Sequence, residues 1–235
     1  MKKFAVFDID GTLIRWQLFH AIVGRLGNMG IMGNEFAPET KAVRMRWKKR
    51  QADTTFSDYE QIFVKRWQEE MHKVPYETYL TVVDEIINEY VEQVYIFTRD
   101  LIKKLKSEGY FLVAISGSPN EIVKRLADYY GFDDFIASDY QVGSDGNFTG
   151  KVNVPITEKD THLKKLVKKH SLTWTDSVAV GDTHNDIKML QLVEKPIAFN
   201  PDHKLAVTAR ERGWRIIVER KSVVYELGPD KWKIA

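Results

Sequence analysis

Two carboxylates stand two residues apart near the N-terminus, at the end of an apolar run. Residues 4–7 are apolar, and Asp8, Ile9, Asp10 and Gly11 follow directly. A run that ends in Asp-x-Asp-Gly predicts a buried strand that brings acidic side chains to the edge of a sheet. Because side chains alternate along a strand, Asp8 and Asp10 are expected on the same side of it. Two carboxylates held together repel each other, which favours a shared divalent cation or a proton on one of them.

A shared divalent cation would give the two acids separate chemical roles. Asp8 would be an ionised nucleophile or a metal ligand, and Asp10 would be a general acid and base. Gly11 permits a tight turn, and its amide could donate to a phosphate oxygen. A strand followed by an ordinary Asp-Gly turn explains the same residues. This segment alone therefore leaves both interpretations open.

Two later segments add groups that suit a phosphate. Ser116 and Gly117 follow the apolar run 110–115, and a hydroxyl at the end of such a strand can hold a phosphoryl oxygen. Lys159 opens a predicted helix, where a lysine is unfavourable for the helix dipole. Another interaction is therefore expected to hold Lys159 there, the alternative being a solvated helix lysine.

A further acidic segment follows the apolar run 177–180. Asp182 stands at the end of this predicted strand, where it can complete an oxygen-rich magnesium site. Asp186 suits either the surroundings of that site or the capping of the next helix. His184 lies between them, but no second histidine stands at metal-ligand spacing, so a zinc-type site is not expected.

Together these segments resemble the motifs of the haloacid dehalogenase superfamily of phosphohydrolases. In chain order they are Asp8-Ile9-Asp10-Gly11-Thr12, Ser116-Gly117-Ser118, Lys159 and Gly181-Asp182-Thr183-His184-Asn185-Asp186. They are spread over most of the chain, and four agreeing motifs are far more specific than any one of them. A predicted β-hairpin over 140–154 resembles the phosphoserine-phosphatase-like branch of this superfamily.

The resemblance implies a Mg²⁺-dependent phosphatase that acts on a small phosphorylated metabolite, a phosphate monoester. The phosphoryl group would pass to Asp8, giving an aspartyl-phosphate that water then hydrolyses. Asp10 would protonate the leaving oxygen and later deprotonate the water. Mg²⁺ would be held by Asp8, the main-chain carbonyl of Asp10 and Asp182, with Asp186 in support. The phosphoryl oxygens would be bound by Ser116, Gly117 and Lys159.

The resemblance says less about the substrate. Phosphoserine-specific members carry an acidic residue shortly after the first motif to hold the substrate amine, and Gln17 occupies that neighbourhood here. A neutral amide cannot replace that charge, so phosphoserine is not the expected substrate. The candidate residues of the substrate pocket are Gln17, Arg44, Arg46 and Trp47. Lys151 is a rival for the role of Lys159, but Lys159 has the separation from Asp182 that this branch shows.

The elements that must position these residues form an alternating pattern. From about residue 100 onward helices alternate with strands, which predicts a parallel α/β sheet. We expect a three-layer, Rossmann-like α/β core with a central parallel sheet, made of residues 1–14 and 96–235. Strands that begin near 4, 111 and 178 would bring their carboxyl ends to one crevice. Residues 15–95 carry apolar stripes at helical spacing and are expected to form an inserted helical cap domain.

A basic run inside the expected cap admits another function. Within residues 41–50 the basic side chains are Lys41, Arg44, Arg46, Lys48, Lys49 and Arg50. They could bind a phosphorylated substrate or a nucleic acid, or they could form a solvated helix surface, as charge runs usually do. Nucleic acid is therefore not the expected partner. A phosphotransferase or phosphomutase is the second alternative, because it would use the same first step on Asp8.

The composition excludes several kinds of site. The chain has 235 residues, enough for one sizeable core with an inserted smaller domain. It contains no cysteine, which excludes disulfides, thiolate zinc sites and cysteine nucleophiles. The net charge of +2 requires neither a nucleic acid nor a membrane as partner. No apolar stretch reaches the length of a membrane span or of a secretory signal, so we expect a cytoplasmic protein. The sequence does not indicate the oligomeric state.

Overall fold

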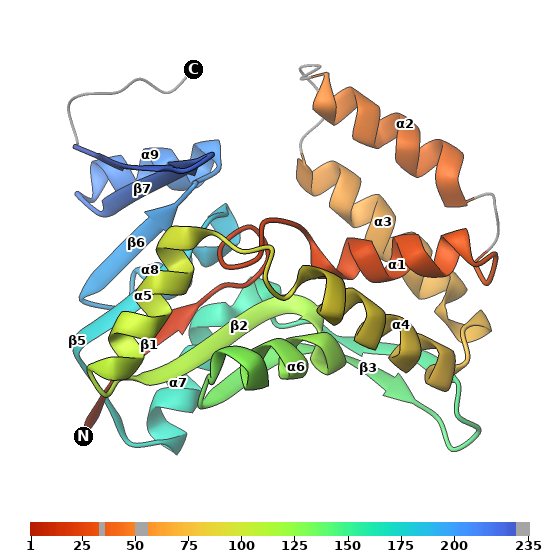
Figure 1. The fold of residues 1–235 in the computed structure, drawn as a ribbon, viewed down its shortest axis with the longest axis horizontal. Helices are drawn as coiled ribbons and strands as arrows, with labels where there is room; N and C mark the ends of the chain where they lie inside the picture. Colours follow the sequence, from red (N-terminus) through yellow and green to blue (C-terminus); the bar gives the residue numbers. More distant parts are fainter. Residues whose placement is uncertain (33–35, 50–55, 229–235) are drawn as a thin grey trace. The chain divides into compact units, whose positions relative to one another are not determined.

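The structure, a computed structural model that describes residues 1–32, 36–49 and 56–228, contains a mostly parallel sheet (Figure 1). In these ranges the sheet has eight strands in the order β4-β3-β2-β1-β5-β6-β7-β8. Parallel pairing joins neighbours from β3 to β7, whereas β8 runs antiparallel to β7. The strands are β1 Lys2–Phe7, β2 Phe111–Pro119, β3 Asp134–Val142, β4 Phe148–Asn153, β5 Leu172–Gly181, β6 Lys195–Phe199, β7 Arg215–Arg220 and β8 Val223–Leu227.

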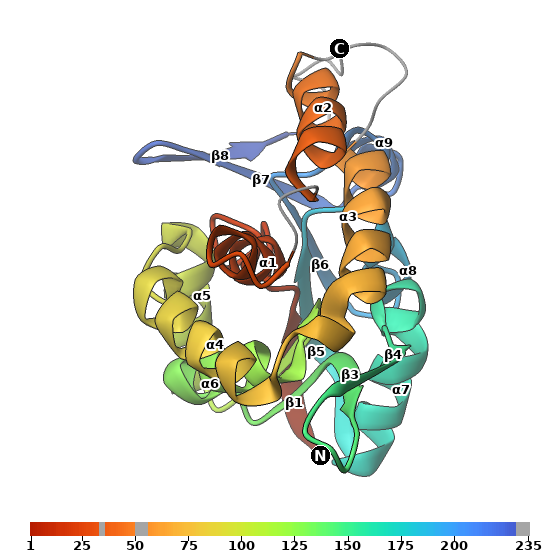
Figure 2. The same cartoon turned by 90° about the vertical axis from the view of Figure 1, so that its right-hand side faces the viewer.

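Helices cover both faces of this sheet (Figures 1 and 2). On one face lie α5 Ile96–Ser107 and α6 Asn120–Tyr130, and on the other lie α7 Lys159–Lys169, α8 Ile187–Leu190 and α9 His203–Glu211. A strand covered on both faces needs a continuous apolar run rather than alternation, and residues 4–7 of β1 are all fully buried. The predicted three-layer α/β core with a central parallel sheet is therefore confirmed.

The inner faces of the helices follow the periodicity of the sequence. In α6 the buried side chains are Ile122, Val123, Leu126 and Ala127, at the spacing of one helical face. The helix ends at Gly131, whose φ of +69° favours a residue without a Cβ atom. On the opposite face of the sheet, α7, α8 and α9 pack on the alternate residues of β1, Phe4 and Val6. Burial on both sides fixes the register of β1, and with it the position of the acids that follow.

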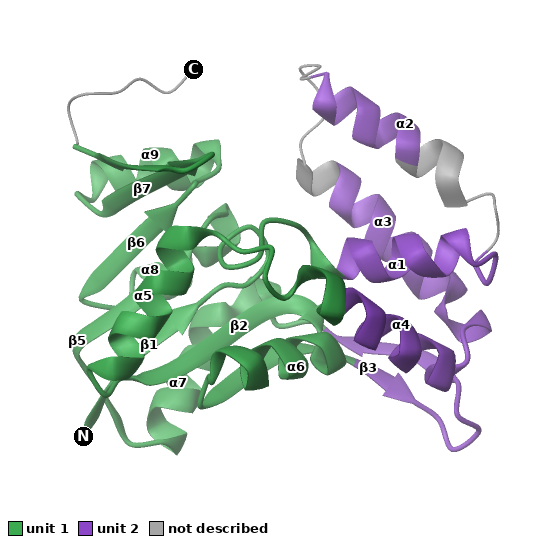
Figure 3. Ribbon diagram, in the orientation of Figure 1, with its two compact units in different colours: residues 1–18, 87–139, 154–235 green, residues 19–86, 140–153 purple. Residues whose placement is uncertain are grey.

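The chain divides into two compact units (Figure 3). The first comprises residues 1–18, 87–139 and 154–235, and the second comprises residues 19–86 and 140–153. The second unit contains most of α1 Leu18–Asn28 and α4 Tyr76–Tyr90, together with α2 Phe36–Lys48, α3 Phe56–Glu70 and β4. No helix in the described ranges is both long enough and apolar enough to cross a membrane.

The boundaries of the second unit differ from the predicted cap, residues 15–95. The segment 140–153 belongs to it because Tyr140 and Phe148 join its aromatic core: the ring centroids of Trp67 lie 6.0 Å from Tyr140 and 5.8 Å from Phe148. Residues 87–95 belong instead with the first unit. There the amide of Arg15 donates to Gln93 O, and a β-bridge joins Ile14 and Val94. Both differences arise from contacts between residues far apart in the sequence.

Candidate active site

Three carboxylates meet at the carboxyl ends of two neighbouring strands. Asp8 follows β1 and Asp182 follows β5, and the parallel register pairs Phe7 with Val180, so both acids emerge at the same edge. Asp186 lies in the short 3₁₀ helix η3, His184–Asp186. Each of the three acids offers one oxygen within 4.8 Å of those of the other two. This all-oxygen donor set is the type that suits Mg²⁺.

A buried lysine neutralises part of this acidic cluster. Lys159, at the first position of α7, is 2% exposed, and its Nζ lies 2.6 Å from both Asp8 Oδ1 and Asp186 Oδ1. Burial lowers the pKa of Lys159, but the two carboxylates raise it more, so the ammonium stays charged. These two ion pairs supply the interaction that a lysine at a helix N-terminus requires.

The carboxylates themselves are poised to hold protons in the absence of a further cation. Burial raises the pKa of Asp8 to about 7, against the opposing effect of Lys159. Burial, followed by the charges of Asp8 and Asp186, raises the pKa of Asp182 well above its ordinary value. A divalent cation among these oxygens would reverse both shifts by favouring the ionised forms. The electrostatics therefore fit a cation at this position.

The side chain of Asp10 has a different set of partners. Its Oδ1 accepts from the amide of Leu18 at 2.7 Å, and its Oδ2 accepts from Ser116 Oγ at 2.9 Å. Burial raises the pKa of this carboxyl group, although both hydrogen bonds oppose the shift. The predicted role of Asp10 in metal binding concerns its main-chain carbonyl, and the predicted role of its carboxyl group in proton transfer stays a prediction.

Two glycines allow the carboxylates to approach the backbone. Gly11 has a φ of +86°, and a Cβ atom there would lie 2.2 Å from Asp182 Oδ2. At Gly181 a Cβ atom would lie 2.4 Å from the Cγ of Asp186. The amide of Gly11 donates to Ile14 O at 2.9 Å. In this conformation the turn uses the Gly11 amide and Asp10 accepts the Ser116 hydroxyl, so binding of a phosphate oxygen by either donor stays a prediction.

Asp186 fills one of the two roles that the sequence left open, the capping of η3, and its role around a metal site stays a prediction. Its Oδ2 accepts from the amides of Asp182 at 3.1 Å and Thr183 at 3.0 Å, which caps η3, while its Oδ1 faces Lys159. Thr12 adds a further contact, because its Oγ1 donates to Asp182 Oδ1 at 3.2 Å. Asp186 is thus a structural cap that also lies within reach of the cluster.

The predicted phosphate-binding pair lies at the end of β2. Ser116 is fully buried, and its Oγ accepts from the amide of Ser118 at 2.9 Å while donating to Asp10. At Gly117 a Cβ atom would lie 3.0 Å from Ile156 Cδ1, so the backbone passes close to the residues that precede α7. The structure thereby connects Ser116 to Asp10, and Asp10 to the first residue of α1.

One residue of this region was missed by the sequence analysis. Asp202 Oδ2 accepts from the amide of His184 at 2.9 Å and lies 2.8 Å from His184 Nδ1, and the amide of Asp202 donates to Asp182 O at 2.8 Å. Its Oδ1 caps α9 by accepting from Leu205 N. An aspartate just before a predicted helix signals the cap. No local pattern signals the contact with the strand end.

The predicted pocket residues are divided between the two units. Gln17 is half-buried just before α1, in the first unit, whereas the other three lie on α2 in the second. Arg44 and Trp47 are half-buried, Arg46 is exposed, and the Trp47 ring stacks on Tyr59 with centroids 6.5 Å apart. Their assembly into one pocket stays a prediction. Lys41, Lys48 and Lys49 of the basic run are exposed, and Arg50 lies outside the described residues.

Comparison with known proteins gives consistent matches. The family model of the haloacid dehalogenase-like hydrolases matches residues 5–191. A histidinol-phosphatase of Neisseria meningitidis is 26% identical over 230 residues, which cover 92% of this chain and 99% of that protein. The phosphoserine phosphatase SerB2 of Mycobacterium tuberculosis is 29% identical over 85% of this chain, but the match spans 44% of its own length.

The solved structures that match share the fold. A structure described as a phospho-aspartyl intermediate analogue of phosphoserine phosphatase superposes with a TM-score of 0.65 at 24% identity, covering 94% of each chain. At this identity the likeness concerns the arrangement of strands and helices alone.

Proposed function

Because this chain belongs to the haloacid dehalogenase-like hydrolases, we propose that it hydrolyses a small phosphate monoester by way of a phosphoryl group carried on Asp8. It is a phosphoric monoester hydrolase, as its phosphatase relatives indicate. The observation that carries the proposed role of Asp8 is its position beside Lys159, with one carboxylate oxygen within 4.8 Å of an oxygen of Asp182 and of Asp186. A carboxylate so placed can attack phosphorus while the ammonium of Lys159, and a cation held by the acids, would offset the charge of the phosphoryl group.

In the first step an oxygen of Asp8 forms a bond to phosphorus as the bond between phosphorus and the ester oxygen breaks. Asp10 gives its proton to that departing oxygen. The raised pKa of Asp10, caused by burial, favours the protonated form that this step requires. Ser116 and the amide of Leu18 hold the carboxyl group in one orientation.

In the second step water attacks phosphorus and the bond between phosphorus and the Asp8 oxygen breaks. Asp10, now ionised, takes the proton from the attacking water, so the enzyme returns to its starting state. Lys159, Ser116 and Gly117 are the proposed partners of the phosphoryl oxygens. Among them Lys159 brings a full positive charge, which the flanking carboxylates keep protonated.

Mg²⁺ is the proposed cofactor. Asp8, the main-chain carbonyl of Asp10 and Asp182 would hold it, with Asp186 beside them. When bound, it would supply positive charge that offsets the charge of the phosphoryl oxygens and keeps Asp8 ionised. The fit rests on the oxygen donors, on the close approach that Gly11 allows, and on the raised pKa of Asp182.

The leaving group of the ester is proposed only as a class. The relatives include a histidinol-phosphatase and a phosphoserine phosphatase, and the substrates in both names are small monoesters that bear an amine. The proposed class of leaving group is therefore a small alcohol that bears an amine. Gln17 cannot supply the negative charge expected to hold the amine of phosphoserine, which argues against that substrate. The proposed compartment is the cytoplasm, which suits a cysteine-free chain.

The test is release of inorganic phosphate from a panel that contains p-nitrophenyl phosphate, O-phospho-L-serine and L-histidinol phosphate. The native protein would be compared with Asp8→Asn and with Asp128→Asn, an exposed aspartate on α6, each with Mg²⁺ or with a chelator. We expect turnover that needs Mg²⁺, is lost in Asp8→Asn and persists in Asp128→Asn. Transfer to an added alcohol instead of water would favour the phosphotransferase. Unchanged turnover in Asp8→Asn would refute the proposal.

A further inference from the structure

One arginine close to the reaction centre has no role in the mechanism proposed above. Arg15 follows the turn that contains Asp10 and Gly11, and its side chain is exposed. In the part of the chain that the structure describes, no carboxylate lies within ion-pair distance of its guanidinium. Arg15 belongs to the first unit, as do Asp182 and Lys159. A guanidinium without an acidic partner in this unit is a candidate binding group for an anion.

The ring of Tyr95 lies at the same edge of the sheet as the carboxylates. The parallel register pairs Gly181 of β5 with Ala198 of β6. The residues that follow them, Asp182 and Phe199, are therefore neighbours across the two strands. Tyr95 packs edge-on against Phe199, with ring centroids 4.9 Å apart. Burial and then the charge of Asp182 raise the pKa of the Tyr95 hydroxyl, in agreement with this position beside Asp182.

Hydrogen bonds hold the segment that carries Arg15 at this edge. Thr12 Oγ1 donates to Asp182 Oδ1 at 3.2 Å, so the segment begins in contact with the carboxylate cluster. The amide of Tyr95 donates to Leu13 O at 2.9 Å, which joins the next residue of the segment to Tyr95. Arg15 stands two residues after Leu13. The backbone therefore starts the Arg15 side chain beside both Asp182 and Tyr95.

The tyrosine ring also fixes the charged end of this side chain. The Arg15 guanidinium lies over the Tyr95 ring, 5.2 Å from its centroid. A cation–π contact favours one position of a side chain that otherwise samples many. A ring face takes up none of the N–H donors in conventional hydrogen bonds, so they stay available to a ligand. A planar guanidinium binds a carboxylate through two parallel N–H···O bonds, and the single charges of the two groups match.

The charges around Arg15 favour an anion over a cation. Residues 11–17 contain no acidic side chain, and Arg15 is the only charged residue among them. Glu219 is a buried acid at the N-terminus of α5, where it accepts from the amides of Ile96 and Phe97 at 3.1 and 2.9 Å. Its charge is therefore satisfied within the fold. The segment after the first motif thus presents a net positive charge, which attracts an anionic group of a substrate.

We propose that Arg15, held on the ring of Tyr95, is a specificity-determining residue that binds a carboxylate of the leaving group. The preferred substrates are then phosphate monoesters of alcohols that bear a carboxylate. This inference rests on the proposed function and adds a feature to its substrate, because the amine inferred from the relatives is a separate group. Arg15 binds a part of the substrate that does not react, so its loss raises KM more than it lowers kcat.

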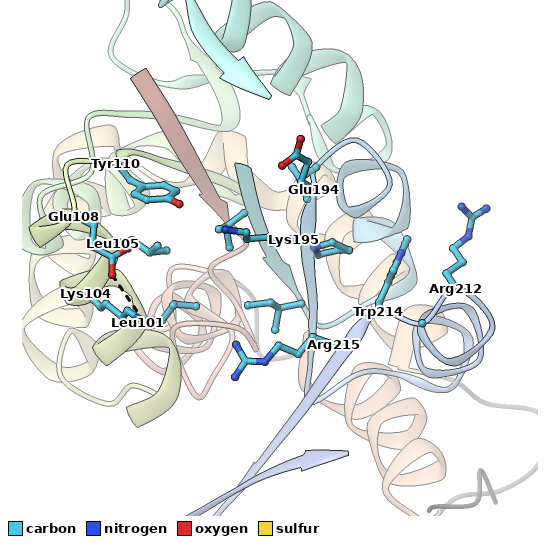
Figure 4. Close-up of a pocket in the computed structure, with 15 residues that line it drawn as sticks. Leu101, Lys104, Leu105, Glu108, Tyr110, Glu194, Lys195, Arg212, Trp214 and Arg215 are labelled. Carbon is cyan, nitrogen blue, oxygen red and sulfur yellow. Dashed lines mark ion pairs between the residues drawn. The ribbon is translucent and has the colours of Figure 1, made fainter. Parts of the chain in front are cut away.

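The experiment measures kcat and KM for two pairs of esters in which only the first member has a carboxylate. The pairs are O-phospho-L-serine with O-phosphoethanolamine, and D-3-phosphoglycerate with sn-glycerol 3-phosphate. The variants are Arg15→Gln, Arg15→Lys and the matched control Arg212→Gln. Arg212 is also exposed and lies 5.7 Å from the centroid of a ring, that of Trp214, but it precedes β7 and so lies at the opposite edge of the sheet (Figure 4).

We expect the native protein to prefer the carboxylate-bearing member of each pair. This preference should fall about tenfold in Arg15→Gln, mainly through KM, recover in part in Arg15→Lys and stay unchanged in Arg212→Gln.

Several results would overturn the inference. The native protein could show no preference within either pair, or Arg15→Gln could weaken both members of a pair equally. Equal effects in Arg15→Gln and Arg212→Gln would reduce the preference to general charge. If the native protein hydrolyses none of the four esters, the proposed function fails separately. Isothermal titration of Asp8→Asn with the same pairs, with and without Arg15→Gln, then decides the inference, and equal binding of the two members refutes it.

Discussion

Removing the ammonium of Lys159 should destabilise the protein in a manner that depends on pH. In Lys159→Met the carboxylates of Asp8 and Asp186 lose a partner 2.6 Å away, while a side chain of similar length fills the space. Removing one member of a buried ion pair typically costs about 3–5 kcal/mol. For a chain of this size each kcal/mol corresponds to roughly 2–4 °C in Tm, so the expected loss at pH 7.5 is about 6–20 °C.

The direction of the pH dependence follows from the pKa of Asp8. In the folded native protein it is raised to about 7, above the value of an unfolded aspartate, because of burial. A carboxyl group with a raised folded pKa loses stability as pH rises from its unfolded pKa toward its folded one. Lys159 lowers the pKa of Asp8, so in Lys159→Met this pKa would be higher still. The variant would therefore go on losing stability up to a higher pH than the native protein. The deficit of Lys159→Met should therefore be smaller at pH 5 than at pH 7.5.

The assay is thermal unfolding followed by circular dichroism at both pH values, without divalent cations. The control is Lys164→Met on the same helix, whose exposed pair with Asp160 should contribute less than about 1 kcal/mol. The reasoning would be refuted if Lys159→Met lost no more stability than Lys164→Met, or if its deficit were as large at pH 5 as at pH 7.5.

Three further predictions concern the same site. Gly11→Ala should lower kcat/KM strongly, because the new Cβ would lie 2.2 Å from Asp182 Oδ2. The control Gly30→Ala, also at positive φ but with open space around it, should lose about 1 kcal/mol of stability and keep its activity. Equal activity in the two variants would contradict this reasoning. Ser116→Ala removes a hydrogen bond that lowers the pKa of Asp10, so the alkaline limb of the pH profile of kcat/KM should move to higher pH and not to lower pH. Mg²⁺ at 100 times its Kd should stabilise the fold by about 2.7 kcal/mol in thermal unfolding, and Asp182→Asn should lose most of this gain; an equal gain in both proteins would place the ion elsewhere.

The local patterns of the sequence were sufficient to predict the core. The apolar runs of β1 and β5 each end in an acidic residue, and in a parallel sheet such ends must share an edge, which is where Asp8 and Asp182 lie. Helix α6 shows the same agreement, since its inward residues recur at helical spacing. The spacing of the apolar residues and the position of the acids after them were enough here, because burial on both faces leaves each strand a single register.

Contacts between distant segments could not be predicted from these patterns. The hairpin after Asp139 reads as part of the core by its position in the chain, yet Tyr140 and Phe148 pack on Trp67 of the second unit. Strand β8 has mostly exposed residues and pairs only with β7, so it lacks the apolar signal of the inner strands. Asp202 reaches the site through the amide-to-carbonyl bond with Asp182, which depends on the backbone and leaves no trace in side-chain types.

The central claim is that the phosphoryl group passes to Asp8, and Asp10→Asn tests it most directly. With p-nitrophenyl phosphate the leaving group departs without an acid, so the first step should proceed, while water attack should lack its base. Acid quenching, digestion and mass spectrometry should then find phosphate on Asp8 in Asp10→Asn, and none in Asp8→Asn/Asp10→Asn. Two results would contradict the mechanism: phosphate on another residue, or rapid release of inorganic phosphate by Asp8→Asn with no phosphorylated peptide.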